Sequence, residues 1–242
     1  MTHLYLIRHG EAVCNVDRDA PTAGMKGDLG LTPLGKLQAE RLRDRLTATG
    51  EIAADVFIAS TLLRARQTAE IVAPAVGLPI TWDDDVQELR VGEIDGVPWR
   101  KIADTVPDFR KEPFRPLSAG GENWPRFVLR VATALERITR EHEGKTIVVV
   151  CHGGVIDSSF VIFSGMSSLV FPTLDLATRN TSITHWERHE DHGAPRWRLH
   201  KYNDDLHVRD IGAEERVHWP LQRERATGGA EGTAVPLPTE EG

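Results

Sequence analysis

Two short apolar runs that end in the same way constrain the fold of this chain more than any other feature. The first, residues 4–7, is followed by Arg8 and His9, and the second, residues 146–151, is followed by His152; a glycine comes directly after each histidine. Short apolar runs bounded by glycine are typical of buried strands. In an open α/β sheet, ligands bind at the carboxyl ends of the strands. The sequence therefore predicts two strands that present a His-Gly pair to one crevice.

Helical patterns alternate with the predicted strands. Thr32 and Pro33 predict an N-cap and a first helical residue, ahead of leucines at helical spacing that end at Gly50. A strand at 55–60 leads into a helix that is interrupted by Pro74. The other expected elements are a strand within 78–85, a short helix at 99–105, a long helix at 122–144 and a helix over 155–165. A hairpin of strands is expected at 180–189 and 195–203.

This order of elements predicts the fold class. Strands alternating with helices favour a single-domain, three-layer α/β/α fold with a mostly parallel, doubly wound sheet and an antiparallel edge hairpin. We expect the domain to cover residues 1–221. Residues 222–242 are rich in Gly, Glu, Thr and Pro and are predicted to form a disordered C-terminal tail.

The composition excludes several classes of partner. A net charge of −7 argues against a general nucleic-acid surface, which needs a basic face. Cys14 and Cys151 form neither a disulfide framework nor a metal motif. The N-terminus has no basic and apolar leader, and no apolar run approaches the length of a membrane span. We therefore expect a cytoplasmic protein with no nucleic-acid and no membrane partner.

Four side chains are expected to meet at the carboxyl edge of the sheet. Arg8 and His9 follow the first strand, Arg64 lies one helical turn after the second, and His152 follows the strand at 146–151. A single histidine or arginine at a strand end is more often structural, but several converging on one edge suggest a site. Arginine forks match phosphate oxygens, and helix N-termini add N–H donors. The cluster predicts a dianion site in which a histidine could act as nucleophile.

Five ordered motifs extend this interpretation to a family. They are LIRHGEAVCN (6–15), STLLRARQTAEIV (60–72), ELRVGEIDG (88–96), GGE (120–122) and VVVCHGGVI (148–156). In their order and spacing they resemble the signature motifs of the histidine phosphatase superfamily, the phosphoglycerate mutase-like proteins. The resemblance spans about residues 4–206.

The resemblance implies a role for each matching residue. His9 would be the phosphorylated nucleophile, held by Arg8, and Arg64 and His152 would bind the transferring phosphoryl group. Two further substrate-binding groups are implied, the side chain of Asn15 and the backbone of Gly153.

The resemblance also implies that Glu88 is the general acid, which protonates the leaving oxygen and then activates water as a carboxylate. A carboxylic acid beside a dianion holds its proton more tightly, which suits this role. From the residues alone, Glu93 or Asp95 would fit equally well, and Glu88 could be a solvated turn residue. Glu11 is expected to be a buried, hydrogen-bonded support.

The superfamily contains both mutases and phosphatases. The mutases carry a long insertion with tyrosine and paired arginines after the acidic motif, whereas residues 97–122 contain neither. We therefore predict a phosphomonoester hydrolase that uses no metal and no cofactor, works through a phosphohistidine on His9, and takes a small phosphorylated metabolite. The alternatives are a cofactor-dependent phosphoglycerate mutase and a non-catalytic phosphate-binding module.

The irregular middle of the chain leaves the substrate open. Its cationic and aromatic residues are Trp99, Arg100, Arg110, Lys111 and Arg115. If they face the pocket, they favour a substrate with a second negative group, and otherwise they form a solvated basic loop.

Three other features have competing interpretations. His185, His189 and His192 could suggest zinc, but their spacing matches no metal motif and we expect them near a hairpin turn. Cys14 and Cys151 flank the histidine motifs and could be sensitive to oxidation, although buried inert thiols are the more usual case. The edge hairpin or the amphipathic helices could support a homodimer.

Overall fold

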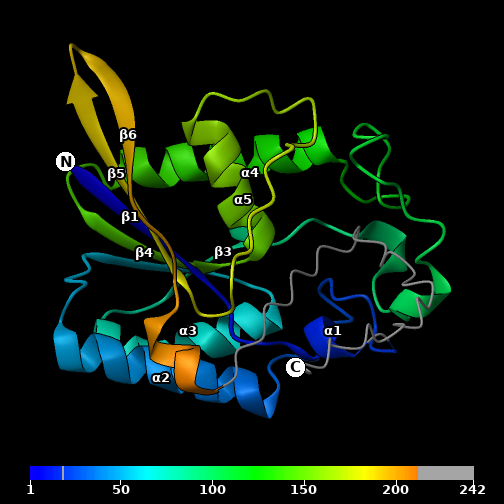
Figure 1. Ribbon diagram of the computed structural model, residues 1–242, viewed down its shortest axis with the longest axis horizontal. Helices are drawn as coiled ribbons and strands as arrows, with labels where there is room; N and C mark the ends of the chain where they lie inside the picture. Colours follow the sequence, from blue (N-terminus) through cyan, green and yellow to red (C-terminus); the bar gives the residue numbers. More distant parts are fainter. Residues whose placement is uncertain (18, 212–242) are drawn as a thin grey trace, which may run out of the picture.

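The computed structural model describes residues 1–17 and 19–211, which form one sheet between two layers of helices (Figure 1). The strands are β1 (Thr2–Arg8), β2 (Val56–Ser60), β3 (Thr81–Asp83), β4 (Thr146–Cys151), β5 (Ile183–Asp191) and β6 (Ala194–Asp204). The helices are α1 (Val13–Val16), α2 (Pro33–Thr49), α3 (Leu63–Val76), α4 (Trp124–Glu141) and α5 (Gly153–Phe163), with 3-10 turns η1 (Asp84–Val86), η2 (Gly92–Ile94), η3 (Trp99–Lys101) and η4 (Leu206–Ile211). The predicted α/β/α fold is confirmed. The expected domain end at 221 and the tail at 222–242 lie outside the described residues.

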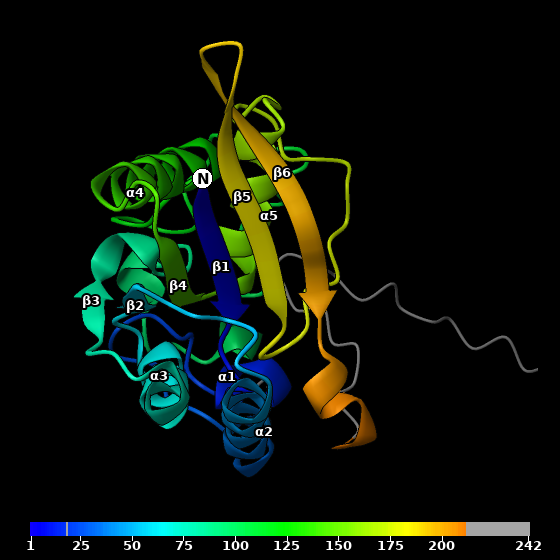
Figure 2. The same ribbon diagram turned by 90° about the vertical axis from the view of Figure 1, so that its left-hand side faces the viewer.

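The strand order places the two histidine motifs side by side. The sheet runs β3-β2-β4-β1-β5-β6, and β1 pairs in parallel with β4, so that Arg8 lies opposite Cys151. The contacts of β2 with β3 and β4 are also parallel. Hairpin β5–β6 joins β1 in antiparallel fashion and closes one edge of the sheet, as predicted (Figure 2).

Alternation along the strands divides the core into two halves. Leu4 and Leu6 of β1 pack toward α4 and α5, whereas Ile7 packs toward α2 and α3. Side chains on a strand point to opposite faces in turn, which explains the division. The irregular middle joins the α4 and α5 side through Phe109 and Leu117, which are buried. It therefore extends this core and has none of its own.

Helix α2 begins and ends where its sequence predicts. The side chain of Thr32 accepts a hydrogen bond from Gly35 N at 3.0 Å, and Pro33 occupies the first helical position. Gly50 ends the helix with φ 59°, a left-handed conformation that costs glycine little.

Three expected boundaries were wrong. Helix α3 continues through Pro74 to Val76. The proline lies in the last turn, so its missing N–H and the clash of its ring with the preceding turn disturb only the end of the helix. In place of the helix expected at 99–105 there is a single 3-10 turn followed by hydrogen-bonded turns. Helix α5 begins at Gly153, two residues early, because His152 is an extended N-cap.

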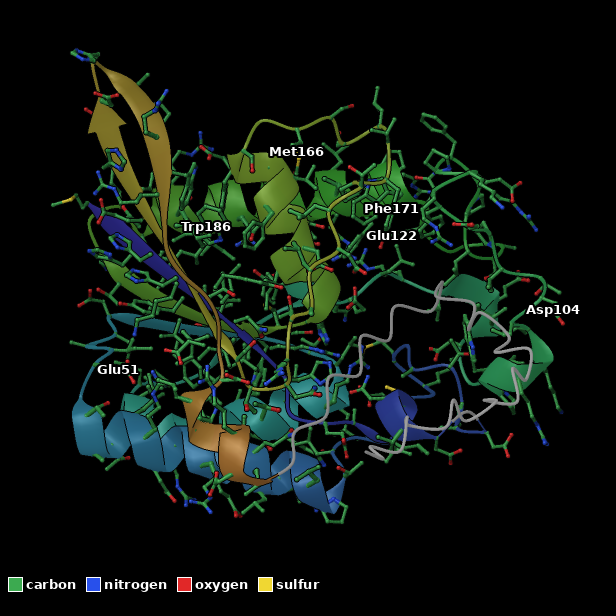
Figure 3. All side chains as sticks on the ribbon, viewed as in Figure 1. Glu51, Asp104, Glu122, Met166, Phe171 and Trp186 are labelled. Atoms are coloured by element: carbon green, nitrogen blue, oxygen red, sulfur yellow. The ribbon has the colours of Figure 1, made fainter. Side chains whose placement is uncertain are left out.

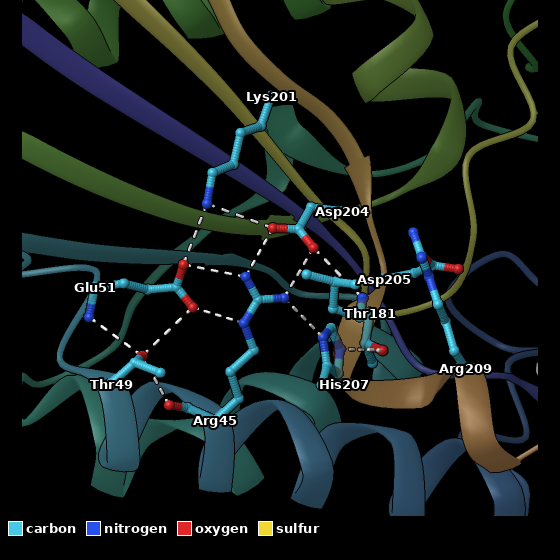
Figure 4. Close-up of polar contacts among 10 residues, drawn as sticks. Arg45, Thr49, Glu51, Thr181, Lys201, Asp204, Asp205, His207 and Arg209 are labelled. Atoms are coloured by element: carbon cyan, nitrogen blue, oxygen red, sulfur yellow. Dashed lines mark hydrogen bonds and ion pairs between the residues drawn. The ribbon is translucent and has the colours of Figure 1, made fainter.

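A charged network fastens the end of the hairpin to α2 (Figure 4). Arg45 of α2 donates to Glu51 at 2.6 Å and to Asp204 of β6 at 2.7 Å, and Lys201 contacts both carboxylates. Hydrogen bonding to Arg45 lowers the pKa of Asp204 to about 2. The network fixes one edge of the sheet.

Within residues 1–17 and 19–211, no helix has the length and apolar character needed to cross a bilayer.

Candidate active site

The nucleophile candidate His9 lies directly beyond β1, next to the second histidine. His9 N donates to Cys151 O at 3.0 Å, which extends the pairing of β1 with β4 by one residue. The ring centroids of His9 and His152 are therefore only 5.1 Å apart. Both side chains are almost fully buried. The two His-Gly pairs meet at one sheet edge, as the sequence predicts.

Hydrogen bonding defines the tautomer of His9. Its Nδ1 lies 2.7 Å from Gly10 O, and since a carbonyl oxygen can only accept, Nδ1 carries the hydrogen. The lone pair is then on Nε2, where Arg64 Nε donates at 3.2 Å. Burial, followed by the positive charges of Arg64 and Arg8, lowers the pKa of His9 well below 6.5. At neutral pH, His9 is thus a neutral imidazole whose Nε2 lone pair carries no proton and accepts a hydrogen bond from Arg64.

Arg64 is held in place by an aspartate that the sequence analysis did not identify. It is the second residue of α3, and its Nη1 donates to Asp28 at 2.8 Å, while its backbone N–H donates to the same carboxylate at 3.2 Å. The second oxygen of Asp28 accepts from Gly30 N at 2.9 Å. Both side chains of the ion pair are almost fully buried. Asp28 therefore fixes the direction in which the Arg64 guanidinium faces His9.

His152 is oriented by Ser60, at the end of the neighbouring strand β2. His152 Nε2 lies 2.7 Å from Ser60 Oγ, and both side chains are fully buried. Burial, followed by the nearby Arg64 and His9, lowers the pKa of His152 well below 6.5. With the hydroxyl bound at Nε2, the other ring nitrogen, Nδ1, is left for a ligand.

Two buried nitrogen atoms in the cluster have no hydrogen-bond partner among residues 1–17 and 19–211. They are His152 Nδ1 and Arg8 Nε. Arg8 is anchored at its other end, where Nη1 donates to Thr178 O. Buried polar groups in folded proteins are generally satisfied, by ligands or water where protein atoms are missing. Arg8 Nε–H is a donor that suits an oxygen atom of a bound anion, and His152 Nδ1 is one in the tautomer in which Ser60 donates to Nε2.

Glu88 contacts the N-terminus of α5, the helix that begins beside His152. One of its carboxylate oxygens accepts from Leu89 N at 2.9 Å and the other from Gly154 N, in the first turn of α5, at 3.0 Å. The other two acidic candidates do not reach the cluster: Glu93 is exposed, and Asp95 accepts from the backbone N–H groups of residues 24, 26 and 27. Of the three carboxylates, only Glu88 contacts the helix that begins beside His152.

The remaining candidates support the loop and the helix start. Asn15 Oδ1 accepts from Ala12 N at 3.0 Å, which caps α1. Gly153 lies against Arg8, since a Cβ added there would be 3.6 Å from Arg8 Nε. Glu11 accepts from the Thr32 hydroxyl at 2.7 Å, as expected of a supporting residue, but it is only partly buried.

A cavity of about 390 Å³ adjoins Glu88. Glycines, apolar side chains and polar side chains all contribute to its walls. Residues along it include Gly24, Met25, Leu62, Gln87, Val91 and Gly120. Its size suits a small-molecule ligand.

The basic residues of the middle segment lie on the surface. Arg100 pairs with Asp19, and Arg110 pairs with Asp108, with at least 60% of each arginine side chain exposed. Lys111 is more exposed still, and Arg115 pairs with Glu112. The structure thus favours the solvated loop over a second anion subsite built from these residues.

The histidines of the hairpin do not form a metal cluster. No group of three metal-ligating side chains occurs in the part of the chain that the structure describes. His185 lies within β5, away from the turn where it was expected, and stacks on Tyr5 with a centroid separation of 4.0 Å. Both cysteines are free, and burial raises the pKa of the Cys14 and Cys151 thiols, which disfavours the reactive thiolate.

The fold and the cluster together define an α/β domain with two buried histidines and two buried arginines at the carboxyl edge of the sheet. The chain belongs to the histidine phosphatase superfamily (branch 1), whose family model matches residues 4–205. The resemblance in the sequence motifs is thereby confirmed.

The relatives include phosphatases and mutase-like proteins. Phosphoglycerate mutase-like protein 4 of Arabidopsis thaliana is 29% identical over 221 residues, covering 86% of this chain and 88% of that protein. Metal-independent phosphoserine phosphatase of the same plant is 26% identical over 225 residues, covering 89% and 87%. A mutant phosphoserine phosphatase of Entamoeba histolytica, solved with phosphoserine, superimposes with a TM-score of 0.66 at 26% identity and covers 86% of this chain and 100% of that chain.

Proposed function

We propose that this chain is a metal-independent phosphomonoester hydrolase that works through a phosphohistidine on His9. The observation that carries the proposal is the state of His9, whose Nδ1–H is fixed on Gly10 O and whose Nε2 lone pair faces Arg64. The lowered pKa keeps this lone pair available at neutral pH. Phosphoryl transfer depends mainly on positioning and charge stabilisation, which Arg8 and Arg64 supply without a metal.

The reaction would proceed in two steps. His9 Nε2 bonds to phosphorus as the bond to the leaving oxygen breaks, and Glu88 gives that oxygen a proton. Water then attacks the phosphohistidine, and the Glu88 carboxylate takes a proton from it, so that inorganic phosphate leaves and both residues return to their starting states. The contact of Glu88 with Gly154 N supports this assignment, because the α5 N-terminus also attracts the phosphoryl group.

For the substrate we propose a small phosphorylated metabolite, in a cytoplasmic setting. The volume of the adjoining cavity and the names of the phosphoserine phosphatases among the relatives support this class. A phosphoglycerate mutase remains the second candidate, because another relative is named mutase-like. Residues 97–122 lack the tyrosine and the paired arginines of the mutase insertion, which favours hydrolysis.

The proposal is tested by measuring phosphate release from a panel of phosphomonoesters in the presence of EDTA. We expect hydrolysis to be unchanged by the chelator, because the arginines supply the positive charge. The panel includes phosphoserine, and 3-phosphoglycerate with and without a bisphosphoglycerate primer. Reversible loss of activity in EDTA would rule out the metal-free mechanism. Isomerisation that requires the primer would indicate a mutase. No activity on any compound of the panel would indicate a phosphate-binding module.

The protonation state of His9 gives a prediction that needs no substrate. Because burial and the two arginines lower its pKa, His9 should remain neutral as the pH falls through 6.5, where an ordinary imidazole takes up a proton. An NMR titration of the histidine ring signals measures this, with the His9 signal assigned from its loss in His9→Ala. The acid limb of kcat/KM should accordingly lie well below pH 6.5. A His9 midpoint at 6.5 or higher would contradict the proposed nucleophile state.

A further inference from the structure

Arg130 of α4 uses its whole guanidinium to hold the segment that carries Glu88. Its Nε and Nη2 donate to the two carboxylate oxygens of Glu122 at 2.8 and 2.7 Å. Its Nη1 donates to Asp85 O at 2.8 Å and to Gln87 O at 3.0 Å, and Nη2 also reaches Glu88 O at 3.2 Å. All five N–H groups of the guanidinium are thereby paired.

Glu122 holds the other side of the same segment. Its carboxylate accepts from Arg90 N at 2.9 Å, and its backbone N–H donates to Arg90 O at 2.8 Å. Figure 3 labels Glu122, which precedes α4. Arg130 therefore binds the chain up to Glu88, and Glu122 binds it two residues later.

The burial of this pair calls for a reason other than stability. Only 9% of each side chain, Arg130 and Glu122, is exposed. Removing two charges from water costs about as much as their attraction returns, so a buried ion pair is weak support for stability as such. The pair instead fixes the position of residues 87–91, because these residues belong to no helix or strand that could otherwise hold them.

We propose that Arg130 and Glu122 are positioning residues for the Glu88 carboxyl. The inference rests on the proposed function, in which Glu88 protonates the leaving oxygen as the His9 Nε2–phosphorus bond forms. A proton donor must lie within hydrogen-bond reach of that oxygen, and a misplacement of about 1 Å can cost on the order of 100-fold in rate. The contacts of Arg130 and Glu122 with this segment keep Glu88 at the N-terminus of α5, where Glu88 contacts Gly154 N.

Two other roles for Arg130 must be separated from positioning. It could act only on stability, or it could act through charge, because it lies close enough to His152 to be one of the groups that lower the pKa of that residue, after burial, Arg64 and His9. Arg130→Lys separates them, since lysine keeps the positive charge but cannot supply a five-donor fork.

The leaving group supplies the readout. An acidic phenol leaves without a proton, whereas a weakly acidic phenol needs one from Glu88. A series of substituted phenyl phosphates, from 4-nitrophenyl to unsubstituted phenyl, varies this need while keeping similar size. Loss of stability or of charge lowers all rates together, but a misplaced acid lowers the rates of the poor leaving groups selectively.

The experiment compares kcat/KM across this series for the wild type, Arg130→Lys and Glu88→Gln. This ratio reports the step in which the leaving group departs, whereas kcat also includes the hydrolysis of the phosphohistidine, which is the same for every substrate. For Arg130→Lys we expect a fall of about 10- to 100-fold on phenyl phosphate and of no more than about 2-fold on 4-nitrophenyl phosphate. Glu88→Gln should show the same pattern more strongly. The matched control is Arg45→Lys, which makes the same change in the network between α2 and β6 and should leave the dependence on the leaving group unchanged (Figure 4).

The outcomes are distinct. An equal fall in kcat/KM on every substrate, or no change in kcat/KM, would overturn the positioning role of Arg130. Glu122→Gln is the second variant, because it keeps the side-chain shape and loses the charged pairing. It should make the rate depend more steeply on the leaving group, to a smaller extent than Arg130→Lys. An unchanged dependence in the folded protein would again overturn the proposal. If the wild type hydrolyses none of the series, or does so without His9, the proposed function itself fails.

Discussion

His9→Ala is expected to lower phosphomonoester hydrolysis by a factor on the order of 10⁴ or more, because it removes the group to which the phosphoryl is transferred in the proposed mechanism. The fold should persist. The His9 backbone N–H keeps its bond to Cys151 O, and Arg64 keeps its ion pair with Asp28. Phosphate release measured at enzyme excess gives the rate, and circular dichroism with thermal unfolding checks the fold.

The matched control is His185→Ala. His185 is also buried, and burial followed by the neighbouring His200 and His3 lowers its pKa to about 4, but it lies in β5 and stacks on Tyr5. Its loss should leave turnover within about 2-fold, as is usual for a side chain that touches no reacting group. Acid-labile, base-stable covalent phosphate should form on the wild type and be missing from His9→Ala. Near-normal turnover by folded His9→Ala would exclude His9 as the nucleophile.

The sequence predicts the strand-end residues well because local signals mark them. An apolar run followed by His-Gly identifies both the strand and the point where it stops. The sequence does not say which strands are neighbours. The pairing of Arg8 with Cys151 joins segments 143 positions apart, so the sequence predicts that both motifs reach one edge of the sheet but not that β1 and β4 are neighbours.

The supporting residues were missed for a related reason. Asp28, Ser60 and Arg130 act on residues 36, 92 and 42 positions away, respectively. Locally they resemble a turn residue, a strand end and an exposed helix position, so no short pattern reveals their roles. Ser60 even lies inside a recognised motif, but only the distance to His152 shows what its hydroxyl does.

For the basic residues of the middle segment, by contrast, nearby acidic residues in the sequence do indicate the surface position. Asp108 lies two residues before Arg110, and Glu112 lies three before Arg115; each pair forms an ion pair in the structure. Opposite charges at such spacing are typical of a solvated surface. Weighing these acidic neighbours would have favoured the surface position from the sequence alone.

The second large effect is expected for Gly35→Ala, in the first turn of α2. This turn packs directly on the loop after His9: Thr32 N donates to Glu11 O at 2.9 Å, and Gln38 accepts from Glu11 N at 2.8 Å. A Cβ at position 35 would lie 1.9 Å from Glu11 O, far inside the contact distance of about 3.5 Å. The loop and the helix must therefore separate.

Helix propensity alone would favour the alanine by about 0.5–1 kcal/mol. The clash reverses the sign, and we expect a net loss of about 1–3 kcal/mol in the free energy of unfolding, as in other overpacked cores. Because the displaced loop carries Gly10, whose carbonyl fixes the tautomer of His9, kcat should also fall by about 100-fold. Urea unfolding and phosphate-release kinetics measure the two effects.

Gly50→Ala separates stability from geometry in this prediction. Gly50 has φ 59° at the end of α2, and apart from its chain neighbours no atom of residues 1–17 and 19–211 lies within 4 Å of an added Cβ. Alanine there therefore costs about 1 kcal/mol through backbone strain alone. Its kcat should equal that of the wild type. If Gly35→Ala were as active as Gly50→Ala, the close approach of α2 would not determine the geometry at His9. If only Gly35→Ala loses turnover while still folded, the glycine is required because the first turn of α2 packs directly on the loop after His9.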